Sequence, residues 1–220
     1  MGQDMREGAR GEAAPDGWPG AGEVVRVGER VTLRRHSPKN RESFQRWYAD
    51  EEIARLLRHD LSPLTERQSR GYFDTLILPL SARGMCWAIH EAASDRLVGS
   101  AAITDVIRTT GSGLYRILIG EKDRWGQGLG TEATQLVLLE AWTTLCLRQV
   151  RLEVFGHNER AIASYRRVGF RQTGTHQEFV SRQGIQIDVR EMVIEVDGDR
   201  DPAERGAPAP EGTENGLDSP

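Results

Sequence analysis

The sequence has few of the residues that mark disulfide-rich and metal-binding proteins. Cysteine occurs only at Cys86 and Cys146 among 220 residues, and neither has a second ligand at a metal-binding spacing. Small secreted domains depend on many paired cysteines, and structural zinc sites depend on closely spaced ones. We therefore expect no disulfide framework and no metal site. Two buried thiols in a reducing compartment fit better, so we expect a cytoplasmic protein.

Long apolar runs are also missing. No run approaches the roughly 20 residues that a helix needs to cross a bilayer. The N-terminal segment has no uninterrupted apolar stretch of the kind found in secretory signals. We expect no membrane partner and no secretory signal.

An excess of basic charge is absent as well. The formal net charge is −4, and residues 197–220 alone carry seven acids and two arginines. The rest of the chain is therefore close to neutral. Nucleic-acid binding domains carry a strong basic patch, so we expect no nucleic-acid partner.

The two ends differ in composition from the middle of the chain. Residues 1–22 and 197–220 are rich in Gly, Ala, Pro and charged residues and show no periodicity. Such composition cannot bury enough apolar surface to offset the entropy of ordering. We expect two disordered tails, the second of them acidic, around one domain at 23–196.

Apolar periodicity divides that domain into helices and strands. Alternating runs bounded by turn residues predict strands, and three-to-four-residue spacing predicts helices. The strands are expected at 24–27, 30–35, 85–91, 97–107, 113–119, 150–155, 170–180 and 185–196. The helices are expected at 38–57 with a break near Ala49–Asp50, from Ser62 or Thr65 to Leu78 with a stop at Pro79, at 131–145 and at 159–168.

The strand–helix–strand unit from Leu114 to Phe155 predicts one parallel strand pair, because a crossover helix joins parallel neighbours. The other strands follow one another through short turns and predict antiparallel pairing. The fold class is therefore α+β, with a mixed, mainly antiparallel twisted sheet flanked by helices.

The segment from Gly120 to Thr131 carries the strongest functional signal. Gly126, Gly128 and Gly130 leave the backbone bare where a strand ends and a helix begins. Free N–H groups and the positive end of the helix dipole attract anions there. We interpret the segment as a site for a pyrophosphate.

Two common pyrophosphate-binding motifs with such a loop do not fit the pattern. A P-loop needs Gly-Lys-Ser/Thr, and here Gly130 is followed by Thr131 and Glu132. A dinucleotide fold places its glycines after the first strand of an alternating β-α-β series, whereas several antiparallel strands come first here. Coenzyme A remains as the third candidate for the ligand whose pyrophosphate binds here.

The run Trp125-Gly-Gln-Gly-Leu-Gly-Thr-Glu-Ala133 is followed by Asn158-(x)6-Tyr165-(x)3-Gly-Phe170. This ordered pair resembles the GNAT acetyltransferases, most closely the RimJ/RimL and spermidine-acetyltransferase branch, over about Arg30 to Glu195. The family pattern has Gln or Arg at the position of Trp125. A cradle of backbone amides does not depend on that side chain.

The resemblance implies acetyl-CoA as co-substrate. Its pantetheine arm would pair with the backbone of a strand, its pyrophosphate would lie over the loop, and Asn158, also a helix cap, would hold a pantetheine amide. Arg124, Arg160, Arg166 or Arg167 could reach the ribose phosphate. The implied cofactor-binding residues are Ile117, Leu118, Ile119, Trp125, Gly126, Gln127, Gly128, Leu129, Gly130, Thr131 and Asn158.

Tyr165 and Glu153 are the implied catalytic residues. Tyr165 lies on an apolar helical stripe and suits a core on its own, but the family pattern places a tyrosine here beside the thioester sulfur. Glu153 matches a glutamate that serves as base in some protein N-terminal acetyltransferases, although an ion pair with Arg151 or another arginine is equally consistent with its position. Glu121, His157 and Asp105 are weaker alternatives for the base, and water could carry the proton instead.

The resemblance predicts direct acetyl transfer to a primary amine of a small molecule such as a polyamine, or of a protein N-terminus. Carboxylates in the expected acceptor region could attract a cationic amine; they are Asp50, Glu51, Glu52 and Glu178. A homodimer is expected for the family. The alternatives are a non-catalytic acyl-CoA-binding regulatory module and a nucleotide-binding protein.

Overall fold

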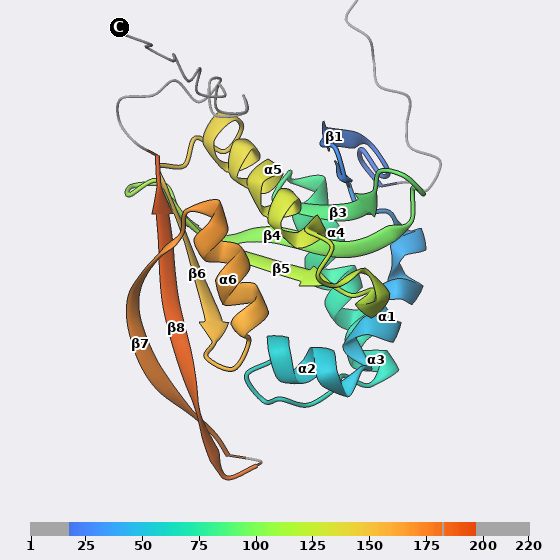
Figure 1. Cartoon of the computed structure of the whole chain (residues 1–220). Helices are drawn as coiled ribbons and strands as arrows, with labels where there is room; N and C mark the ends of the chain where they lie inside the picture. Colours follow the sequence, from blue (N-terminus) through green and yellow to red (C-terminus); the bar gives the residue numbers. More distant parts are fainter. Residues whose placement is uncertain (1–17, 182, 197–220) are drawn as a thin grey trace, which may run out of the picture.

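A computed structural model describes residues 18–181 and 183–196 (Figure 1). The two predicted tails fall outside these residues, except for 18–22. The described residues form one sheet of eight strands in the order β1-β2-β3-β4-β5-β6-β8-β7. The strands are β1 Val24–Val27, β2 Val31–Arg34, β3 Cys86–Glu91, β4 Leu97–Ile107, β5 Ser112–Ile119, β6 Gln149–Phe155, β7 Arg171–Val180 and β8 Ile185–Glu195.

Helices cover both faces of this sheet and bury two separate cores. On one face, α5 (Leu129–Thr143) and α6 (Glu159–Val168) pack on a core that includes Trp87, Val137 and Leu152. The other face carries a core that includes Phe44 and Phe73. Its elements are η1 Pro38–Asn40, α1 Arg41–Tyr48, α2 Glu51–Leu57, α3 Glu66–Tyr72, η2 Phe73–Ile77 and α4 Leu78–Ala82.

The predicted mixed sheet is confirmed, with β5 and β6 as its parallel pair. Their pairing is short: only Ser112, Gly113 and Leu114 are in register with Gln149, Val150 and Arg151. Beyond these residues the two strands diverge while each keeps its other neighbour. The sheet therefore opens at the carboxyl ends of its two parallel strands.

Local capping explains the helix boundaries on the α1–α4 face. The predicted break at Ala49–Asp50 is confirmed, because the Asp50 side chain accepts the N–H of Ile53 at 3.0 Å and starts α2. Thr65 starts α3 with a capping box that includes Gln68. Of the two predicted caps, Thr65 is the one used.

The predicted stop at Pro79 is wrong. The chain makes a π-helical turn over η2, in which the N–H of Leu78 bonds to the carbonyl of Phe73, and then continues as α4. Pro79 lies in the first turn of α4, where a missing N–H costs little. The wider turn thus lets the helical path pass a residue that would break a regular helix.

Two further expectations need correction. Helix α5 begins at Leu129, two residues before the predicted start, so Gly130 and Thr131 lie in its first turn. Cys86 is buried as predicted, but Cys146 is exposed in the loop between α5 and β6. No helix in residues 18–181 or 183–196 combines the length and apolarity that a membrane span requires.

Candidate active site

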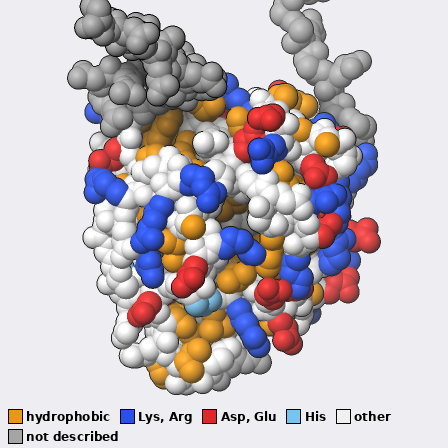
Figure 2. Space-filling model, in the orientation of Figure 1, with side chains coloured by type: hydrophobic (Ala, Val, Ile, Leu, Met, Phe, Trp, Pro, Cys, Tyr) orange, Lys and Arg blue, Asp and Glu red, His pale blue; other side chains and the backbone are white. Residues whose placement is uncertain are grey.

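A cavity of about 340 Å³ lies where β5 and β6 diverge. Figure 2 shows a hollow on this face with apolar side chains inside and basic side chains around it. Its walls come from β5, the glycine loop, the first turn of α5, the end of β6, and α6. The strand divergence therefore supplies the space that a packed sheet would fill.

The glycine loop presents a run of free backbone donors to this cavity. Gly128, in the left-handed region with φ 81°, caps α5, and the first bond of the helix is from the N–H of Glu132 to its carbonyl. Within the described part of the chain, the N–H groups from Gly126 to Thr131 have no hydrogen-bond partner. Gly126, Gly128 and Gly130 all line the cavity. A bound anion would satisfy these donors.

The one carboxylate in the first turn of α5 is turned away from the loop. Glu132 accepts the backbone N–H groups of Glu29, Arg30 and Val31 at 2.7, 2.8 and 3.1 Å. These bonds join α5 to the β1–β2 connection. The negative charge is held on the sheet side, so it does not compete with an anion at the helix start.

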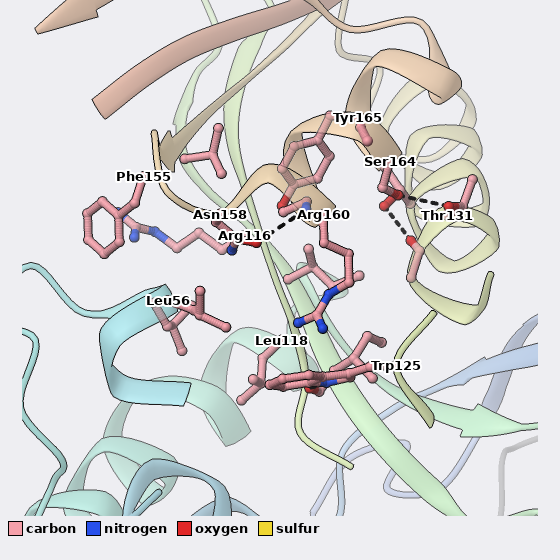
Figure 3. Close-up of a pocket in the computed structure, with 18 of the residues that line it drawn as sticks. Leu56, Arg116, Leu118, Trp125, Thr131, Phe155, Asn158, Arg160, Ser164 and Tyr165 are labelled. Carbon is pink, nitrogen blue, oxygen red and sulfur yellow. Dashed lines mark hydrogen bonds between the residues drawn. The ribbon is translucent and has the colours of Figure 1, made fainter. Parts of the chain in front are cut away.

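Trp125 and Arg160 connect the loop to α6. The Trp125 indole donates to the Ile119 carbonyl at 2.7 Å, and the Arg160 guanidinium lies 3.8 Å from the centre of its ring. Figure 3 shows Arg160 reaching from α6 onto the flat face of Trp125. Burial lowers the pKa of Arg160, with Glu52 opposing the effect, yet it remains a cation at neutral pH. A cation therefore lies on the wall that faces the loop.

Asn158 has the cap role predicted for it and also lines the cavity. Its carboxamide oxygen accepts the N–H of Ala161 at 3.2 Å and starts α6. The amide donors of the side chain have no partner among the described residues. Nearby, Thr131 bonds Ser164 at 2.8 Å and fixes α6 against the start of α5. The cap and a contact with a ligand are thus compatible.

Tyr165 extends from α6 into the same cavity (Figure 3). The residue is 8% exposed, and its ring packs edge-on to Tyr115, with centroids 6.4 Å apart, and against Phe170 at 5.8 Å. Burial raises the pKa of its phenol. Tyr165 is therefore a protonated hydrogen-bond donor at neutral pH, held by packing at the point where the strands separate.

Glu153 lines the cavity from β6, on the face of the strand opposite Leu152 and Val154. It is exposed, and it lies across from Glu191 of β8 in the sheet register. The ion pair with Arg151 that the sequence allows is not formed among the described residues. Glu153 is thus a carboxylate on the opposite face of the sheet from Tyr165, next to the same opening.

The weaker alternatives for the base have other positions. Glu121 is buried and binds Arg46, Arg96 and the Trp47 indole; despite burial, these partners hold its pKa below the ordinary value. His157 donates its Nε2–H to the Arg55 carbonyl oxygen at 2.9 Å, and Asp105 is exposed at an irregular point of β4 with φ 49°. None of the three lines the cavity.

The predicted cofactor residues are mostly brought together. Ile117, Leu118, Ile119, Trp125, Gly126, Gly128, Leu129, Gly130, Thr131 and Asn158 line the cavity, as do Arg124, Arg160 and Arg167. Gln127 and Arg166 do not, and the Gln127 side chain donates to the Asp123 carbonyl instead. The backbone amide of Gln127 still belongs to the run of free donors.

The sequence did not single out His59, which lines this cavity from the end of the α2 region. Its Nδ1 lies 2.5 Å from Glu178 of β7, and its ring meets Phe155 edge-on at 5.6 Å. Burial opposes ionisation of Glu178, but hydrogen bonds from His59 and His176 hold its pKa low. When neutral His59 donates Nδ1–H to this carboxylate, Nε2 is left as a proton acceptor. No local motif marks a pair 119 residues apart.

A second cavity of about 410 Å³ adjoins the first on the α1–α4 side. The two share Leu57, His59, Arg116, Ile117 and Leu118. The acids proposed for a cationic acceptor do not line it: Asp50 and Glu52 bind Lys122, Glu51 is exposed, and Glu178 binds His59. A ligand in either cavity would reach the common wall where the sheet opens.

Comparisons with known proteins agree with this geometry. A family model described as the acetyltransferase (GNAT) domain matches residues 30–171. An uncharacterized N-acetyltransferase p20 of Bacillus licheniformis is 22% identical over 73% of this chain and 90% of its own length.

Solved structures share the fold. The spermidine N-acetyltransferase of Vibrio cholerae, in complex with CoA and spermine, has a TM-score of 0.65 at 19% identity, over 76% of this chain and 96% of that one. The microcin C7 self-immunity acetyltransferase MccE, in complex with acetyl-CoA and AMP, has a TM-score of 0.66 at 14% identity, over 80% and 98%.

Proposed function

Because the chain belongs to the GNAT acetyltransferase family, we propose that it transfers the acetyl group of acetyl-CoA directly to a primary amine. The observation that carries the proposal is the run of unpaired N–H groups from Gly126 to Thr131 beside a cavity that also contains Tyr165. The residues present fit the cofactor. Bare amides suit its pyrophosphate, and the free edge of β5 beyond Leu114 suits its amide-bearing arm.

Tyr165 would stabilise the leaving group. As the amine attacks, the C–N bond forms, the C–S bond breaks and a thiolate develops, whose ordinary pKa is near 8.5. The pKa of Tyr165 is raised, so the phenol keeps its proton and can donate a hydrogen bond to the developing thiolate. Acid help of this kind contributes about 10² to 10⁴ in rate.

The amine must lose a proton before it attacks, because a primary ammonium has an unperturbed pKa of about 8 to 10.4. Glu153 is the proposed acceptor of that proton, since it lies on the opposite face of the sheet from Tyr165 at the same opening. His59 is a second candidate for the base, because its 2.5 Å contact with Glu178 orients the imidazole ring. The amine would thus approach from the face opposite to α5 and α6.

The test is release of free thiol from acetyl-CoA in the presence of a broad panel of amines. The expected result is turnover that needs both the amine and acetyl-CoA. Acetyl-CoA should also raise the melting temperature, whereas ATP should not, because a specific ligand stabilises by RT ln(1 + [L]/Kd). Stabilisation by acetyl-CoA without turnover on any amine would favour the non-catalytic acyl-CoA-binding module instead.

We also propose that the chain belongs to the RimJ/RimL and spermidine-acetyltransferase branch of the family. A cytoplasmic location and a homodimer stay predictions from the sequence. A direct route without an acetyl-enzyme fits the positions of both cysteines, because neither Cys86 nor Cys146 lines the cavity at the glycine loop.

A further inference from the structure

The second cavity has the shape and lining of a site for an apolar group. Aromatic and aliphatic side chains from α1, α3, η2, α4 and the facing strands surround it, among them Phe44, Tyr48, Tyr72 and Leu76. Its wall is shared with the cofactor-side cavity. If acetyl transfer occurs at the sheet opening, as proposed above, this cavity is where the body of the acceptor would lie.

The charges around it do not suit a polycation. Asp60 is the one carboxylate among the described residues that line it, and Asp60 already binds Arg58 through two contacts of 3.0 and 2.8 Å. The buried phenol of Tyr48 has a pKa raised well above the ordinary value and carries no charge. An acceptor with several ammonium groups would find no unpaired carboxylate in this cavity.

Arg116 supplies the opposite charge. It extends from β5, lines both cavities, and has no hydrogen bond or ion pair among the described residues. Figure 3 shows its side chain reaching toward Phe155. The neighbouring residues Leu114 and Leu118 bracket it on the face of β5 that looks toward α1–α4, and Leu118 belongs to that core. A free guanidinium therefore stands at the junction of the two cavities.

Glu153 stands on the other side of the opening. Leu114 of β5 is in register with Arg151 of β6, so Arg116 and Glu153 occupy equivalent positions two residues further along each strand. The strands have diverged there, and the two side chains form no ion pair within 4.0 Å. Across the opening, the unpaired Arg116 thus faces the unpaired Glu153 in the described structure.

From these charges we infer that the acceptor is a free α-amino acid with a large apolar side chain. Arg116 binds its carboxylate in the planar, two-bond geometry that guanidinium favours. Glu153 receives the ammonium and its proton. The side chain fills the second cavity, and the products are the N-acetyl amino acid and the coenzyme A thiol.

The experiment compares acceptors that differ in one group, with thiol release as the readout. L-Phenylalanine tests the full proposal, phenethylamine lacks the carboxylate, glycine lacks the apolar side chain, and spermidine is a polycation. The expected result is a kcat/KM for phenylalanine at least about tenfold above the other three, because phenethylamine and spermidine lack the carboxylate for a charge-assisted hydrogen bond and glycine lacks the buried apolar side chain. Equal or better turnover of phenethylamine or spermidine would overturn the inference while leaving the acetyltransferase proposal intact.

Arg116→Gln isolates the carboxylate contact. It should raise the KM for phenylalanine at least about tenfold and leave both phenethylamine turnover and the KM for acetyl-CoA unchanged. Arg151→Gln is the matched control, an exposed arginine on the paired strand that lines neither cavity. A loss that is equal for all amines would contradict a role in carboxylate binding. If the unaltered protein turned over none of the amines, the proposed function would be overturned as well.

Discussion

The two halves of the active-site opening are built in different ways. On the α5–α6 side, the ligand-facing groups are backbone amides from one continuous loop, Gly126 to Thr131. On the α1–α4 side, they are side chains from several helices and from strands far apart in the sequence. The first half is formed by residues that are adjacent in the sequence, whereas the second forms only after the whole chain has packed.

The largest expected effect concerns Tyr165, which lines the cavity on the α5–α6 side. Tyr165→Phe keeps the ring packing against Tyr115 and Phe170 but removes the proton donor. The kcat should fall by about 10² to 10⁴, and the KM for acetyl-CoA should stay unchanged. Because burial raises the pKa of Tyr165, the unaltered protein should lose no activity through this group between pH 7 and pH 9. An unchanged kcat would remove Tyr165 from the chemistry.

The α1–α4 side of the opening, which we call the acceptor half, should be the part whose stability is sensitive to acid. His36 is buried there between Asn40 and Ser100, and burial lowers its pKa from 6.5 to about 4. Below pH 6.5 the unfolded chain takes up a proton that the folded protein refuses down to about pH 4, so stability falls as the pH drops through this window. The loss should approach about 3 kcal/mol near pH 4. Chemical denaturation of the protein and of His36→Gln checks it, and equal slopes in both would contradict the assignment.

The cofactor half should be sensitive to one added side chain. A Cβ at Gly130 would meet only Ile119, at 3.5 Å, so Gly130→Val should leave the fold in place. It should weaken acetyl-CoA binding on the order of 100-fold, because charged hydrogen bonds of about 2 to 3 kcal/mol are lost. Titration calorimetry measures this. Gly71→Val in α3, where a Cβ meets nothing within 4 Å, is the control. Equal affinity in both variants would place the pyrophosphate elsewhere.

A smaller effect should distinguish the two bases. Glu153→Gln should lower kcat/KM at pH 7 by about tenfold, less than the roughly 10² to 10⁴ typical of general-base help, because water can carry part of the proton flow. His59→Gln, measured in parallel, reports on the pair with Glu178. Glu191→Gln, opposite Glu153 in the sheet but outside both cavities, is the control. If neither Glu153→Gln nor His59→Gln exceeds the control, no dedicated base acts here.

The difference between the halves also explains what the sequence could predict. The α+β sheet, its parallel pair and the glycine loop follow from periodicity and local motifs, and the structure confirms them. Asn158 was predicted in both of its roles, and its cap is confirmed. These features depend on residues close together in the chain.

The acceptor half was predicted less well for the same physical reason. The sequence leaves the carboxylates of Asp50 and Glu52 available to bind a cationic acceptor, but folding places Lys122 beside both. His59 carries no local signal in the sequence, because its partner Glu178 lies in a hairpin far along the chain. The π-turn before Pro79 likewise depends on packing around Phe73 and Ile77 and not on a turn motif. Tertiary contacts decide each of these cases.

The central claim is that the sheet opening between β5 and β6 holds the reacting thioester, with its pyrophosphate on the glycine loop. A crystal structure of the protein with acetyl-CoA tests it most directly. The account predicts pyrophosphate oxygens within hydrogen-bond distance of the amides of Gly128 to Thr131 and the thioester sulfur beside the Tyr165 hydroxyl. Acetyl-CoA bound away from this loop, or a sulfur far from Tyr165, would contradict it.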